Sequence, residues 1–78
     1  MPCIARHGPY QFHFFSNENR EPPHVHVDRE RVSAKFWLAP VALAHNDGFN
    51  GHELRRIEAI VREHQLRFLE AWHAYFTK

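Results

Sequence analysis

The chain has 78 residues, which is enough for one domain, residues 1–78, around one hydrophobic core. Its composition is that of a folded protein, 44% hydrophobic and 24% charged, and a formal net charge of +1 is too small to indicate nucleic-acid binding from charge alone. A single cysteine excludes an intrachain disulfide and a zinc site built from several cysteines.

Alternating apolar and polar residues in the first half of the chain predict β-strands with one buried face. The predicted elements are strands at 3–6, 10–15, 24–28 and 31–38, with a turn at 7–9 and a polar loop at 16–23. In the second strand, Tyr10, Phe12 and Phe14 share one face because side chains alternate with period two.

A two-residue loop at Arg29 and Glu30 is expected to join the third and fourth strands, pairing Val27 with Val32 and His24 with Lys35. One face then collects Val25, Val27, Val32, Ala34 and Phe36. The other face collects His24, His26, Asp28, Arg31, Ser33, Lys35 and Trp37. Arginine and glutamate are poor residues for such a turn, so a longer loop and another register stay open.

The segment 40–49 is the hardest to assign, and its pattern fits a short strand or an irregular crossover ending in a tight turn. From Asn50 the period becomes helical, with Asn50 as N-cap and Glu53 completing a capping box. His64 and Gln65 interrupt the apolar stripe, so residues 51–77 form either one long helix or two. This order predicts an α+β fold: a small antiparallel sheet of four to five strands, with one long C-terminal helix or two helices packed on one face.

The stretches FFSNENREPPHVHV, AKFWLAPVALAHNDGF, ELRRIEAIV and LEAWHAYF resemble a prokaryotic family, the domain of unknown function 4160, over nearly the whole chain. The family's pattern falls on Ser16, Asn17, Pro22, Pro23, His24, His26, Lys35, Phe36, Trp37, Leu38, Pro40, Gly48, Phe49 and Trp72. Family members often have a glycine-rich hairpin after the histidine pair, where this chain has Asp28 to Arg31. The resemblance also implies a protein partner, because such genes often lie beside one for the domain of unknown function 2442, as toxin–antitoxin genes do.

One hypothesis for the uncovered sheet face is a metal site. His24 and His26 leave one strand on the same side, Asp28 continues that side, and His13 approaches from the neighbouring strand. Three nitrogen or oxygen ligands and a water would suit zinc or manganese. A bare histidine pair fixes no third ligand by its spacing, so the sequence offers zinc or manganese as a candidate cofactor without establishing one.

A second hypothesis is a small ribonuclease or a metal-dependent hydrolase. Metal-independent RNA cleavage needs a general base, a general acid and a cation, and His26, His24 and Lys35 could fill those roles. Phe15 and Trp37 could stack RNA bases. The nearly neutral net charge argues against this hypothesis.

The third hypothesis, which we favour, is that the chain is a small cytoplasmic interaction protein of a two-gene, toxin–antitoxin-like module. Here His24 fixes the strand entrance by hydrogen bonds, Lys35 is solvated, and Phe15 and Trp37 form a surface for a small protein partner or a second copy. No apolar run approaches the roughly 18 residues needed to span a bilayer, so we expect no membrane association.

Overall fold

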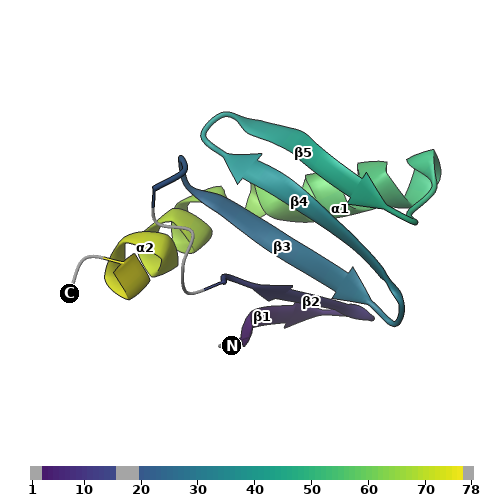
Figure 1. Ribbon diagram of the computed structural model, residues 1–78, viewed down its shortest axis with the longest axis horizontal. Helices are drawn as coiled ribbons and strands as arrows, with labels where there is room; N and C mark the ends of the chain where they lie inside the picture. The colour runs from purple at the N-terminus through teal and green to yellow at the C-terminus, as the bar shows by residue number, and fades with distance from the viewer. Residues whose placement is uncertain (1–2, 16–19, 77–78) are drawn as a thin grey trace.

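The computed structural model describes residues 3–15 and 20–76, and for Cys3 the backbone alone. Within these residues five strands precede two helices (Figure 1). The strands are β1 (Cys3–His7), β2 (Tyr10–His13), β3 (His24–Arg29), β4 (Val32–Leu38) and β5 (Val41–Asp47), and the helices are α1 (Gly51–Glu63) and α2 (Gln65–Phe76). The family-pattern positions Ser16 and Asn17 lie outside the described residues.

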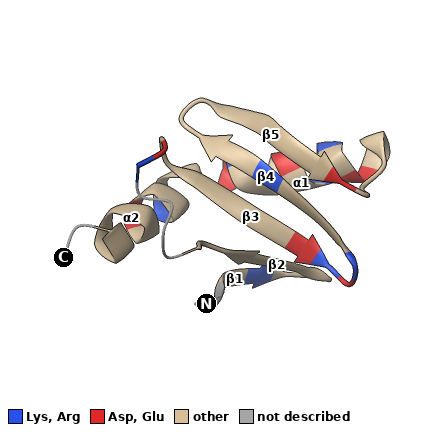
Figure 2. Cartoon of the chain, in the orientation of Figure 1, with Lys and Arg blue, Asp and Glu red and all other residues tan. Residues whose placement is uncertain are grey.

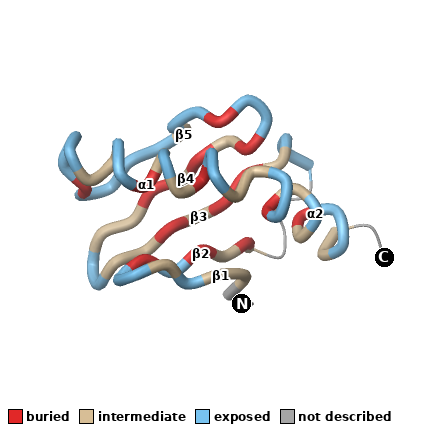
Figure 3. The backbone as a smooth tube through the Cα atoms, turned by 180° about the vertical axis from the view of Figure 1, so that it is seen from behind, coloured by how far each residue is buried: buried red, intermediate tan, exposed pale blue. Residues whose placement is uncertain are grey.

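The five strands form one antiparallel sheet in the order β1-β2-β3-β4-β5, so each strand pairs with its neighbours along the chain. Both helices lie on the same side of this sheet (Figures 1 and 3). The predicted α+β fold, with helix packed on one face, is confirmed. Neither described helix is long and apolar enough to cross a membrane.

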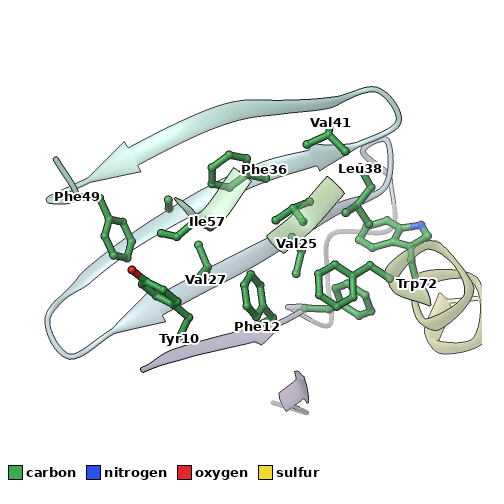
Figure 4. Close-up of a cluster of buried hydrophobic side chains, with 14 residues drawn as sticks. Tyr10, Phe12, Val25, Val27, Phe36, Leu38, Val41, Phe49, Ile57 and Trp72 are labelled. Atoms are coloured by element: carbon green, nitrogen blue, oxygen red, sulfur yellow. The ribbon is translucent and has the colours of Figure 1, made fainter. Parts of the chain in front are cut away.

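The core lies between the sheet and the helices (Figure 4). The strands contribute every second side chain to this core. Tyr10, Phe12 and Phe14 are all buried, while Gln11 between them is exposed. The helices supply Ile57, Val61, Phe68 and Trp72. Aromatic rings fill much of this small core; the Phe14 ring meets the Trp72 ring edge-on at 5.3 Å between centroids.

The long helical stripe is broken into two helices at His64. The His64 backbone has φ −108° and ψ 19°, outside helical geometry, and its N–H donates to the Ile60 carbonyl at 3.1 Å, which closes α1. The side chain of Gln65 then donates to the Leu38 carbonyl at the end of β4, at 2.6 Å. This bond ties the start of α2 to the sheet, so the two residues that interrupt the apolar stripe are those that end one helix and anchor the next.

The β3–β4 hairpin differs from the predicted register by two residues. Its loop is Glu30 and Arg31, because Arg29 pairs with Val32 inside the ladder. The Arg29 guanidinium binds the Glu53 carboxylate of α1 at 2.5 and 2.9 Å, which holds Arg29 in the strand. A shift by an even number keeps the side chains of the two strands on their predicted faces, whereas Arg31 leaves the ladder for the loop. The predicted sorting of the strand residues is confirmed although the predicted pairs are wrong.

Glu30 has φ 55°, in the left-handed region that favours glycine. We expect Glu30→Gly to raise the free energy of unfolding by about 0.5–1 kcal/mol, because relief of the backbone strain exceeds the entropy cost of glycine. Urea denaturation measures this change. Glu30→Ala is the matched control, since it removes the same exposed carboxylate but keeps the unfavourable φ; an equal gain in both variants would show that strain at Glu30 is not the cause.

Candidate functional site

The side of the sheet away from the helices, here called the open face, carries the residues singled out in the sequence. Direct cross-strand pairs join His13 to His26, His26 to Lys35, and Lys35 to His45. These four residues, the middle row, therefore cross β2, β3, β4 and β5 side by side on the open face. Paired residues of adjacent antiparallel strands have Cβ atoms about 5 Å apart, so each side chain of the row reaches the next.

Aromatic rings pack around His26. The His13 ring lies nearly parallel to the His26 ring, at 16° and 5.8 Å between centroids. Phe15 meets His26 at 4.3 Å and His13 at 5.1 Å, both edge-on. Asp28 adjoins the group, with its Oδ2 atom 3.6 Å from Nε2 of His13. The predicted candidates His13, Phe15, His26 and Asp28 are thus brought together.

Lys35 is held by two partners. Its Nζ donates to Oε1 of Glu21 at 2.6 Å and lies 4.7 Å from the centre of the Trp37 ring. Only 19% of the side chain is exposed. The prediction of a solvated Lys35 is wrong, because the loop before β3 brings Glu21 over β4 and neutralises the ammonium group.

His24 is completely buried, at 0% exposure, although alternation assigns it to the same face as His26. As the first residue of β3 it lies at the sheet end beside α2, where the Trp72 ring is 4.9 Å away and the Trp37 ring 5.7 Å. Its Nδ1–H donates to the Pro22 carbonyl at 2.9 Å. Exposure of His24 was wrongly predicted, whereas its proposed role in fixing the strand entrance by a hydrogen bond is confirmed.

A second row crosses all five strands beside the middle row. Its members, the charged row, are Arg6, Gln11, Asp28, Ser33 and Asp47. Figure 2 shows charged residues on β1, near the β3–β4 turn and at the end of β5. A positive side chain therefore lies on one outer strand of the sheet and a negative one on the other.

The sequence does not indicate His45 as a member of this row, because the segment 40–49 fits either a short strand or an irregular crossover. Simple alternation along β5 would place His45 on the same side as Leu43, the cross-strand partner of buried Phe36. The register shifts between Lys35 and Phe36, so Ala44 is an extra residue on β5 and His45 moves to the open face. The alternation Val41-Ala42-Leu43 could have indicated the strand, but it does not reveal the bulge.

Among residues 3–15 and 20–76, no three histidine, cysteine, aspartate or glutamate side chains converge as metal ligands. His13, His24, His26 and Asp28 still adjoin one another, through ring contacts of 5.8 and 5.2 Å and the Asp28 contact. The hypothesis that they hold zinc or manganese stays a prediction.

A separate polar cluster lies on the helix side of the sheet. Glu53 accepts hydrogen bonds from Arg29 and, at 3.0 Å, from the Tyr10 hydroxyl. The bonds from Arg29, and then from Tyr10, hold the pKa of Glu53 below its ordinary value of 4.5. Burial, and then the bond to Glu53, raise the pKa of Tyr10. The Glu53 backbone N–H also donates to the Asn50 side chain at 2.8 Å, which confirms Asn50 as the N-cap.

The depressed pKa of Glu53 predicts a pH-dependent contribution to stability. A carboxyl group with a lowered pKa in the folded state stabilises it above pH 4.5, and this contribution is lost as the pH falls through the folded-state value. We therefore expect Glu53→Gln to lower the urea midpoint near neutral pH, and the difference from the parent protein to shrink near pH 3. Glu58→Gln, which removes an exposed ion pair to Arg62, should change the midpoint little; a Glu53→Gln deficit that persists unchanged in acid would contradict this account.

The family described as Domain of unknown function (DUF4160) matches residues 10–73. This stretch includes the whole middle row and most of the described chain. No curated protein and no solved structure matches.

Proposed function

The chain belongs to the family described as Domain of unknown function (DUF4160), and we propose that it is a protein-interaction module whose partner covers the open face of the sheet. The observation that carries this proposal is charge compensation within the chain. Lys35 is paired with Glu21, and His13 lies beside Asp28. A protein partner that covers these side chains would bury charges that already have a counter-ion, so no unpaired charge would be left in the interface.

The same observation weighs against RNA as the main partner. Nucleic-acid binding draws its affinity from cations that neutralise phosphates, and Lys35 already has a carboxylate at 2.6 Å. Trp37 and Phe15 are partly exposed at the same end of the open face, and aromatic side chains are enriched where protein interfaces are most buried. A partner in the cytoplasm, encoded by a neighbouring gene in a toxin–antitoxin-like pair or supplied by a second copy, fits this surface.

The test replaces aromatic and small residues of the open face by aspartate. Trp37→Asp and Ala42→Asp, on adjacent strands, should each abolish complex formation with the protein encoded by the adjacent gene, measured by co-expression and isothermal titration. Ala42 is exposed, so its substitution changes the face without opening the core. Leu66→Asp is the matched control, because Leu66 is 75% exposed on α2 and lies off the open face. Binding retained by both face variants, with circular dichroism unchanged, would refute the proposal.

A second candidate, a ribonuclease or hydrolase, is favoured by the middle row. His26 has His13 and Lys35 as direct cross-strand neighbours, which offers two imidazoles and a cation for proton transfer and phosphate binding. His24 is buried with its ring 5.2 Å from that of His26, so in this mechanism it would position His26. Cleavage of RNA by tag-free protein, lost in His26→Ala and kept in His52→Ala, would support this candidate, and its loss on chelation would indicate a metal.

A further inference from the structure

We infer that the open face is complementary to itself and that the partner which covers it is a second copy of the chain, related by a two-fold axis parallel to β3. This inference rests on the proposed function, because it names the partner for the same surface. It follows from how the charged row and its neighbours are ordered across the sheet.

A two-fold axis parallel to the strands and above β3 places β3 over β3, β2 over β4, and β1 over β5. Residues keep their level along the strands, so each row faces the same row of the other copy. Sheets that pack face to face lie about 10 Å apart with strands roughly aligned, which this axis allows. The sheet order β1-β2-β3-β4-β5 puts β3 at the centre, as the axis requires.

The outer members of the charged row become complementary under this rotation. Arg6 on β1 faces Asp47 on β5, and the symmetry makes this contact twice. Both residues are exposed, and the long arginine side chain can reach across the gap between the sheets. Gln11 on β2 faces Ser33 on β4, which pairs an amide with a hydroxyl.

The aromatic end and the middle row are also compatible with this rotation. Phe15 follows His13 by two residues and so lies near the level of His24 and its partner Trp37, which brings the partly exposed Phe15 ring of one copy toward the Trp37 ring of the other. His13 faces Lys35, and each has its own carboxylate nearby, Asp28 for His13 and Glu21 for Lys35. On the axis itself His26 meets His26, and Asp28 meets Asp28, a like-charge contact that opposes the pairing and that the two Arg6–Asp47 contacts must outweigh. A two-fold axis perpendicular to the strands would lay the charged row over the aromatic end instead and lose the Arg6–Asp47 pairs.

The experiment measures self-association of tag-free protein by sedimentation equilibrium over a wide range of concentration. The parent protein is expected to dimerise, and Arg6→Glu and Asp47→Arg should each weaken the dimer at least about ten-fold by placing like charges opposite each other. The double variant Arg6→Glu/Asp47→Arg exchanges the charges, so its dimer should return to within about three-fold of the parent's. Arg67→Glu, on the exposed surface of α2, is the control that changes net charge alone.

Recovery of dimer affinity in the double variant supports the inference. If Arg6 and Asp47 acted independently on the structure, the two losses of affinity would instead add. A parent protein that stays monomeric, or a dimer indifferent to both single changes, overturns it. The proposed function is tested separately. It stands even without a dimer if the protein of the adjacent gene binds the monomeric chain and Trp37→Asp abolishes that complex. Circular dichroism on every variant ensures that a lost dimer is not an unfolded chain.

Discussion

Replacing Gly48 with alanine is expected to lower the free energy of unfolding by about 3 kcal/mol or more. Gly48 follows β5 and has φ 111°, a conformation that side-chain-bearing residues rarely adopt. A Cβ atom there would lie 3.0 Å from the Val32 Cβ and closer still to its Cγ1. The χ1 angle of valine is restricted, and the Val32 backbone is held in β4. Neither the side chain nor the backbone of Val32 can therefore move away from the added Cβ atom without a large cost in free energy. Urea denaturation measures the loss.

The chain contains a matched control for this prediction in Gly8. Gly8 also has a positive φ, 58°, but an added Cβ atom meets nothing within 4 Å. Gly8→Ala should therefore cost about 1 kcal/mol, for the conformation alone. Equal losses at the two glycines would show that the Val32 contact contributes nothing, and would leave only the backbone conformation as the reason for glycine at position 48.

The sequence predicted the faces of the sheet better than its pairings. Val25, Val27 and Ala34 are buried and His26 and Lys35 lie on the open face, as alternation indicated. The observed loop lies one residue later than predicted, and the pairing register changes by two residues, because Arg29 belongs to the ladder. The reason lies 24 positions away, in the Glu53 carboxylate that binds Arg29, and no local pattern reports such a contact.

Two further features of the open face could not be predicted from the sequence, because each depends on structure that no local sequence pattern marks. His45 joins the middle row only because Ala44 is bulged, and a bulge inverts alternation without marking the residues that cause it. His24 has the right parity for the open face but is covered by Trp72 from α2. Alternation assigns a side of the sheet, whereas burial depends on how far the helices extend over its ends.

His24→Ala is expected to lower the free energy of unfolding by about 3 kcal/mol. The substitution removes a fully buried ring that contacts Trp72 and Trp37, and it leaves the Pro22 carbonyl without the Nδ1–H donor. His24→Asn and His24→Phe separate the two causes. Asparagine can place its amide nitrogen near the position of Nδ1 and so keep a donor, whereas phenylalanine keeps the ring and loses the donor.

We expect both of these variants to be more stable than His24→Ala, and a loss under about 1 kcal/mol for alanine itself would contradict the structural role. His26 lies two residues further along the same strand and its side chain is partly exposed. His26→Ala should therefore lower the free energy of unfolding by less than His24→Ala does. The comparison decides how functional data on the histidine pair can be interpreted. Activity or binding lost in His24→Ala follows from a damaged strand entrance and the Trp72 contact, whereas a loss in a stably folded His26→Ala places the function on the open face.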